Sequence, residues 1–93
     1  MANKPDNRAE VVTLCYFASV RELVGLPSET VELPAGAATV ADLLAWLRSR
    51  GEEYEAALGQ GDVKVAVDHV HASTSAAIAG VREIAFFPRM TGG

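Results

Sequence analysis

Positively charged side chains are scarce in this chain of 93 residues, where eight lysines and arginines stand against twelve aspartates and glutamates and the net charge is −4. The eight cations form no run. Because proteins bind nucleic-acid phosphates through clustered Lys and Arg, this composition argues against a nucleic-acid partner. Long hydrophobic runs are also missing, so the sequence contains no candidate membrane span.

Cysteine is nearly absent, and the single Cys15 excludes an internal disulfide. It lies in an apolar run without a base or cation beside it, so we interpret it as a small buried hydrophobic residue and not as a reactive thiol. The first ten residues are polar and lack the apolar centre of a secretory signal, and we interpret residues 1–10 as a disordered leader. These features together predict a cytoplasmic protein.

Aromatic residues make up only 6% of the chain, whereas 49% of its residues are hydrophobic. This composition is typical of one small globular domain with an aliphatic core. Segments rich in β-branched and aromatic residues predict four strands, at 11–17, 28–33, 63–67 and 83–87. We expect the first strand to be central and the second to lie at an edge, and Pro88 closes the last because proline cannot continue a ladder.

The segment from Thr39 to Gly51 predicts the main helix. Thr39 can cap its start, with Asp42 three residues later completing a short capping box, and Gly51 can cap its end. Hydrophobic residues recur with helical spacing at Val40, Leu43, Leu44 and Leu47.

Shorter elements fill the remaining segments. The sequence predicts a helical turn within 18–26 that ends at Gly25, a second short helix over 52–58, and a turn over 68–71. The order of strands and helices predicts an α+β domain over residues 11–88, in which a sheet packs on one main helix.

Several polar residues could carry chemistry, but each has a simpler interpretation. His69 and His71 have the spacing of two metal ligands on one strand, yet nothing completes a zinc site, and we interpret them as solvated turn residues. Glu52, Glu53 and Glu55 fit an exposed helix face. The sequence shows no pairing of a nucleophile with a base, which indicates a protein that works only with partners.

The chain ends in two glycines, Gly92 and Gly93, soon after a strand. Glycine has no Cβ, so this end can pass through a narrow channel, and the carbonyl carbon of the last residue is open to attack. In that strand Phe86 and Phe87 must face opposite sides. We expect Phe86 to enter the core and Phe87 to lie outside, close to the tail.

An exposed aromatic residue near a free chain end suggests a docking surface. With Val65 or Val67 and the first strand beside it, Phe87 could form an apolar patch of the kind that binds partners. A docking surface beside a short free end is what a carrier needs if it delivers its own C-terminus to another protein.

Two segments carry a resemblance to a known family. The run from Phe17 to Gly25 (Phe-Ala-Ser-Val-Arg-Glu-Leu-Val-Gly) resembles the first strand and following turn of the molybdopterin synthase small subunit. The ending, with residues 83–88 followed by Thr91-Gly92-Gly93, resembles that family's C-terminus, and the agreement extends over residues 11–93. The resemblance implies a ubiquitin-like β-grasp fold with a mixed sheet.

The resemblance also implies a sulfur carrier. An activating enzyme would use ATP to adenylate the carboxylate of Gly93, sulfur would replace an oxygen to leave a thiocarboxylate, and Gly92 would act as a spacer. The sulfur would pass to a pterin precursor in molybdenum cofactor biosynthesis. The chain would then be the non-catalytic carrier subunit of a sulfurtransferase complex, with no stably bound cofactor.

The implied partners are the large subunit of molybdopterin synthase and the adenylating enzyme, with two small subunits on a large-subunit dimer. Residues 89–93 would form a flexible carrier tail. The residues expected to contact partners are Phe87, Pro88, Arg89, Met90 and Thr91.

The sequence departs from the family at two places. Arg89-Met90 follow Pro88 where a second proline is frequent, and residues 80–83 replace a more acidic turn. A related carrier for thiamine, cysteine or tRNA thiolation therefore remains an alternative, as does a ubiquitin-like modifier that forms isopeptide bonds through Gly93. A binding module with a frayed end is a further alternative.

Overall fold

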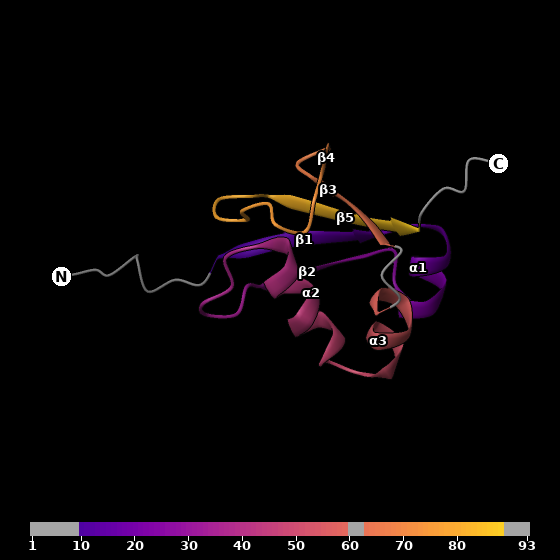
Figure 1. Ribbon diagram of the computed structural model, residues 1–93. Helices are drawn as coiled ribbons and strands as arrows, with labels where there is room; N and C mark the ends of the chain where they lie inside the picture. The colour runs from indigo at the N-terminus through magenta and orange to yellow at the C-terminus, as the bar shows by residue number, and fades with distance from the viewer. Residues whose placement is uncertain (1–9, 60–62, 89–93) are drawn as a thin grey trace.

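The computed structural model describes residues 10–59 and 63–88, which form a mixed sheet with helices on one side (Figure 1). The predicted tail at 89–93, most of the predicted leader and residues 60–62 lie outside the described residues. The elements in chain order are β1 (Val11–Tyr16), α1 (Ala18–Val24), β2 (Ser28–Glu32), α2 (Val40–Arg48), α3 (Glu52–Leu58), β3 (Val63–Val67), β4 (Val70–Ala72) and β5 (Glu83–Pro88).

The sheet has the strand order β2-β1-β5-β3-β4. β1 and β5 are parallel neighbours at the centre, and every other neighbouring pair is antiparallel. The first and last strands of the chain thus lie side by side. The predicted α+β class, the central position of β1 and the edge position of β2 are all confirmed.

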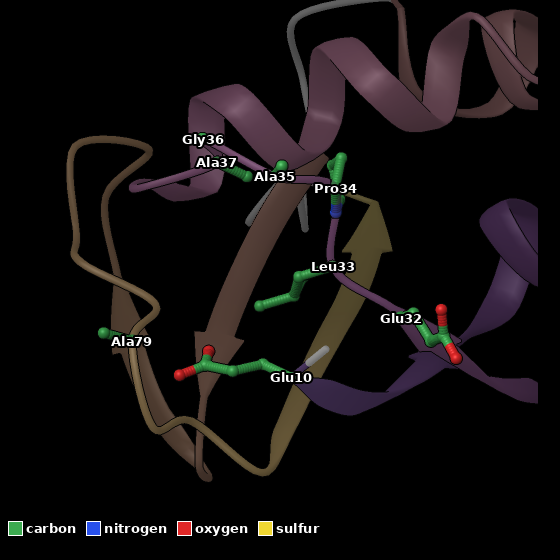
Figure 2. Close-up of a pocket in the computed structure, with 8 residues that line it drawn as sticks. All are labelled: Glu10, Glu32, Leu33, Pro34, Ala35, Gly36, Ala37 and Ala79. Atoms are coloured by element: carbon green, nitrogen blue, oxygen red, sulfur yellow. The ribbon is translucent and has the colours of Figure 1, made fainter. Parts of the chain in front are cut away.

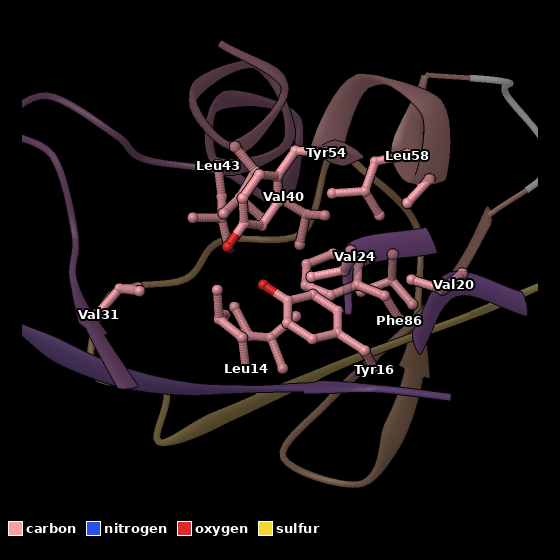
Figure 3. Close-up of a cluster of buried hydrophobic side chains, with 14 of the residues drawn as sticks. Leu14, Tyr16, Val20, Val24, Val31, Val40, Leu43, Tyr54, Leu58 and Phe86 are labelled. Atoms are coloured by element: carbon pink, nitrogen blue, oxygen red, sulfur yellow. The ribbon is translucent and has the colours of Figure 1, made fainter. Parts of the chain in front are cut away.

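The core lies between the sheet and the helices (Figure 3). β1 alternates, so that Val12, Leu14 and Tyr16 are buried while the residues between them face the other way. Buried side chains from all three described helices pack against this face, among them Val20, Val24, Val40, Leu43, Leu47, Tyr54, Ala57 and Leu58.

The start of α2 follows the sequence prediction. The Thr39 side chain accepts a hydrogen bond from the Asp42 backbone, and the Asp42 carboxylate accepts one from the Thr39 backbone, which completes the capping box. The role predicted for Gly51 is wrong. Ser49 caps the end of α2, and Gly51 is instead the N-cap residue of α3, because only three residues separate the two helices.

The region after β3 departs from prediction at one strand. Asp68 and His69 form the expected turn, both with positive φ, but Val70 already starts β4, so the predicted turn over 68–71 is too long. The Asp68 carboxylate accepts hydrogen bonds from the backbone N–H groups of Arg82 (3.0 Å) and Glu83 (2.9 Å). This side chain therefore ties the hairpin turn to the start of β5.

One polar cluster joins the sheet to the helices, and the sequence pattern did not reveal it. A single oxygen of Glu29, Oε2, accepts hydrogen bonds from the hydroxyls of Tyr54 (2.7 Å) and Tyr16 (2.8 Å) and from Arg50 Nη1 (3.3 Å). Figure 3 shows the two tyrosine hydroxyls pointing toward one another between the helices and the sheet. The Arg50 guanidinium also lies 4.8 Å from the centre of the Tyr54 ring.

Burial alone would raise the pKa of Glu29, but the hydrogen bonds from Tyr54 and Tyr16 and the charge of Arg50 hold the pKa below its ordinary value of 4.5. Burial, together with the hydrogen bond to the negatively charged Glu29, raises the pKa of the Tyr54 hydroxyl to about 12. The cluster is therefore most stable with an ionised carboxylate between neutral phenols.

Replacing this carboxylate is expected to destabilise the fold in a pH-dependent way. At pH 7 Glu29→Gln should lower the free energy of unfolding by about 1–2 kcal/mol, because the hydroxyls lose a charged acceptor. Since the folded pKa is depressed, the wild-type advantage exists above pH 4.5 and is lost as the pH falls through the folded value. Urea unfolding at neutral pH and near pH 3 would show a narrowing gap; an equal gap at both would contradict this account.

Candidate docking face and C-terminal strand

The end of β5 is held on both sides. β1 pairs with it up to Tyr16 opposite Phe86, and β3 pairs with it up to Val63 opposite Pro88. The backbone N–H of Phe17 donates to the carbonyl of Phe86 at 3.0 Å, one residue beyond the last paired position of β1. The point from which residues 89–93 continue is therefore fixed by two neighbouring strands.

The two adjacent phenylalanines divide between the faces of the sheet as predicted. Phe86 is 0% exposed and stacks on Tyr16 with ring centres 5.9 Å apart. Phe87 is half-buried on the opposite face, where its ring lies edge-on to that of His71 at 5.4 Å. The helices leave this second face uncovered within the described residues, and we call it the outer face.

The predicted neighbours of Phe87 are wrong. Val65 pairs with Phe86 and is 2% exposed, and Val67 packs against the core, so both lie on the helix side of the sheet. The error came from assuming the wrong parity for β3, because a strand side chain shares its face with the residue directly opposite. Lys64 pairs with Phe87 instead and shares the outer face.

Phe17 is a further member of the outer face that the sequence reading placed only within a strand. It is 51% exposed and follows β1 on the same side as Cys15, beside the end of β5. Its successor Ala18 has φ 54, an uncommon conformation for alanine, at the start of α1. The alternation of β1, continued by one residue, would have identified Phe17 as outward-facing.

Cys15 also lies on this face, which corrects its predicted place in the core. It sits between Ser28 of β2 and Ala85 of β5 in the register and is half-buried. Burial raises the pKa of its thiol, and the nearby Glu83 raises it further. The thiol is therefore held in its neutral, poorly nucleophilic form, in agreement with the structural role expected for it.

Among the other polar residues considered from sequence, His71 lies on the outer face, whereas the carboxylates of α3 and His69 lie away from Phe87. Glu52, Glu53 and Glu55 are exposed on α3, as predicted, and Glu55 pairs with Arg48 at 2.9 Å. His69 is in the turn, 3.9 Å from Glu83, whereas His71 lies on β4 against Phe87 and is not a turn residue. Neither joins a cluster of three potential metal ligands within residues 10–59 and 63–88.

A hollow of about 570 Å³ opens at the other end of the molecule, next to the start of β1 (Figure 2). Its two carboxylates do not converge, because Glu10 extends toward Ala79 while Glu32 points away from it. An acid–base pair is therefore not formed there. Across the helices that the structure describes, none is long and apolar enough to span a membrane.

The sequence matches the ThiS family model over residues 14–93. The chain belongs to the ThiS family. Curated relatives include the molybdopterin synthase sulfur carrier subunits of Haemophilus influenzae, 31% identical, and Escherichia coli, 32% identical. Both alignments cover 83 residues, which is 89% of this chain and all of each relative.

Solved structures of similar fold agree with this assignment. SAMP1 from Haloferax volcanii superposes with a TM-score of 0.71 at 26% identity, over 90% of this chain and all of the other. A putative molybdopterin converting factor subunit 1 from Pyrococcus furiosus gives a TM-score of 0.65 at 28% identity, over 86% and 98%. The ubiquitin-like β-grasp fold implied by the resemblance is confirmed.

All of the site residues predicted from the sequence lie within the match to the ThiS family. Phe87 and Pro88 lie at the end of β5, where the structure describes them, while Arg89, Met90, Thr91, Gly92 and Gly93 lie outside the described residues. The family match nonetheless continues through all of them to the last residue.

Proposed function

We propose that this ThiS-family chain is the sulfur carrier subunit of molybdopterin synthase, with Gly93 as the residue that carries sulfur. The observation that supports this most is the full-length alignment with two molybdopterin synthase sulfur carrier subunits, together with a family match that includes Gly93. These relatives favour the pterin pathway over thiamine, cysteine or tRNA thiolation.

The proposed chemistry has two steps at one carbonyl carbon. The Gly93 carboxylate attacks the α-phosphate of ATP on an activating enzyme, and pyrophosphate leaves. A hydrosulfide ion then attacks the acyl adenylate, AMP leaves with the bonding electrons, and loss of the S–H proton leaves the chain ending in a thiocarboxylate. A carboxylate is a poor electrophile and adenylation supplies the leaving group, while glycine leaves the carbonyl unhindered.

The position of the outer face next to the end of β5 supports this proposal. Phe17 and Phe87 lie at the same end of the sheet as Pro88, from which the tail continues. Exposed aromatic residues of this kind commonly anchor protein interfaces. A partner bound there would sit beside the start of the tail, and the carrier itself needs no bound cofactor because ATP binds the activating enzyme.

The proposed partners are the activating enzyme and the molybdopterin synthase large subunit in the cytoplasm, in a complex of two small and two large subunits. The test is reconstitution: the thiocarboxylated chain and the large subunit of its own host should convert the pterin precursor to the dithiolene form, with one sulfur consumed per chain. Failure of a thiocarboxylated chain to transfer sulfur, with an active large subunit, would overturn the assignment to this pathway.

A second function is supported by the likeness to SAMP1 from Haloferax volcanii, since a solution structure from Methanosarcina acetivorans spells out SAMP1 as small archaeal modifier protein 1. In that role the amine of a lysine would attack the Gly93 adenylate, AMP would leave, and an isopeptide bond would form. Recovery of Gly93 joined to lysines of several host proteins would favour the modifier. Its absence in cells that accumulate the thiocarboxylate would favour the sulfur carrier alone.

A further inference from the structure

Charged side chains are distributed unevenly over the outer face of the sheet. At the end of the face near Pro88, Lys64 pairs with Phe87 and is exposed. At the opposite end, Glu83 pairs with Thr13 and Glu32 pairs with Val11. The face therefore carries a cation at the end where the tail begins and carboxylates at the other.

Small side chains occupy the strip between these ends. The register places Ser28, Cys15, Ala85, Ala66 and His71 in one row across β2, β1, β5, β3 and β4. Only His71 in this row has a large side chain, and its ring rests against Phe87. The row therefore consists mostly of short, apolar side chains. The longer side chains of Phe87, His71 and Lys64 lie along one border of it.

His71 adds a second hydrogen-bond donor to this border. Its imidazole lies 5.4 Å from the Phe87 ring in an edge-on contact and is exposed to solvent. Even when neutral, an imidazole has one N–H group that can donate to a carboxylate. Lys64 and His71 thus flank Phe87 from β3 and β4, and we call these two residues the basic border.

We propose that the basic border selects and orients the protein that receives the tail, by pairing with a carboxylate placed next to that partner's apolar seat for Phe87. This inference rests on the proposed function, because the partner is the one that binds the C-terminal residues. A partner docked in the reverse orientation would set its carboxylate against Glu32 and Glu83, and like charges would oppose it. Only one orientation aligns Pro88 with the partner's active site.

The test is the affinity of the full chain for the host's molybdopterin synthase large subunit, measured by calorimetry at low and at high salt. Lys64→Glu is expected to weaken binding by about tenfold or more at low salt, because it sets a carboxylate against a carboxylate. Lys64→Met keeps the aliphatic stem and should weaken binding less, with a smaller salt dependence than wild type. His71→Glu should act in the same direction as Lys64→Glu.

Arg82→Glu is the matched control, because it makes the same charge change at an exposed site before the other end of β5. It should alter affinity by less than about twofold if position, and not net charge, determines the effect. Urea midpoints close to wild type would show that the variants fold.

Two results would overturn the basic border. One is a Lys64→Glu affinity within about twofold of wild type while Phe87→Ala abolishes binding, which leaves the proposed function intact. The other is an equal loss in Arg82→Glu and Lys64→Glu. Failure of the wild-type chain to bind an active large subunit would overturn the proposed function and this inference together.

Discussion

Removal of Gly92 and Gly93 is expected to abolish adenylation and sulfur acceptance completely. The deletion leaves Thr91 at the terminus, whose β-branched side chain crowds the carbonyl carbon that must be attacked. It also shortens the chain that follows Pro88, so the new carboxylate stops about 7 Å short of the activating site. The measurement is ATP–pyrophosphate exchange with the host's activating enzyme.

The fold should not respond to this deletion. The last hydrogen-bonded strand ends at Pro88, so every described core and sheet contact is retained. The urea unfolding curve is expected to match that of the full chain within about 0.5 kcal/mol. Retained pyrophosphate exchange would show that Gly93 is not the activated residue, and the carrier chemistry would have to be abandoned.

Substitution of Phe86 is expected to affect mainly the stability of the fold, and substitution of Phe87 mainly the affinity for the partner. Phe86→Ala should lower the free energy of unfolding by about 3–5 kcal/mol, because Phe86 is fully buried and stacks on Tyr16. Such a loss is a large fraction of the stability of a small domain. Phe87→Ala should cost only about 1 kcal/mol, since its ring is half-buried, but should weaken partner binding by about tenfold or more.

Each variant serves as the control for the other, because both remove one phenyl ring from the same strand. Urea unfolding measures the first effect, and calorimetric binding to the large subunit at a temperature where both variants are folded measures the second. Equal losses of stability would contradict the assignment of the two rings to opposite faces. Unchanged affinity of Phe87→Ala would remove the outer face as the docking surface.

Local sequence patterns predicted most of the fold. The capping box at Thr39 and Asp42 and the burial of Val40, Leu43 and Leu47 depend on neighbours within a few residues, and all are present. The end of α2 was wrong because a glycine signals a break without saying which helix it belongs to. β4 was missed because a three-residue strand has too few positions to show alternation.

The sequence predicted that Phe87 lies on the outer face, but it did not predict which residues lie beside it. The alternation of β5 showed that Phe86 and Phe87 face opposite sides, but their neighbours depend on the register between strands distant in sequence. That register placed Lys64 beside Phe87 where Val65 or Val67 had been expected. The Glu29 cluster was hidden for the same reason, since Tyr16, Glu29 and Tyr54 come from three separate elements.

The central claim is that sulfur is carried on Gly93, and tandem mass spectrometry of the C-terminal peptide tests it most directly. The chain would be incubated with its host's activating enzyme, ATP and a sulfur donor, and then treated with a thiol-directed alkylating agent. Fragmentation must locate the change, because exchange of oxygen for sulfur has nearly the mass of Met90 oxidation. A captured thiocarboxylate on Gly93 is the predicted result, and an unmodified Gly93 with a demonstrably active enzyme would contradict it.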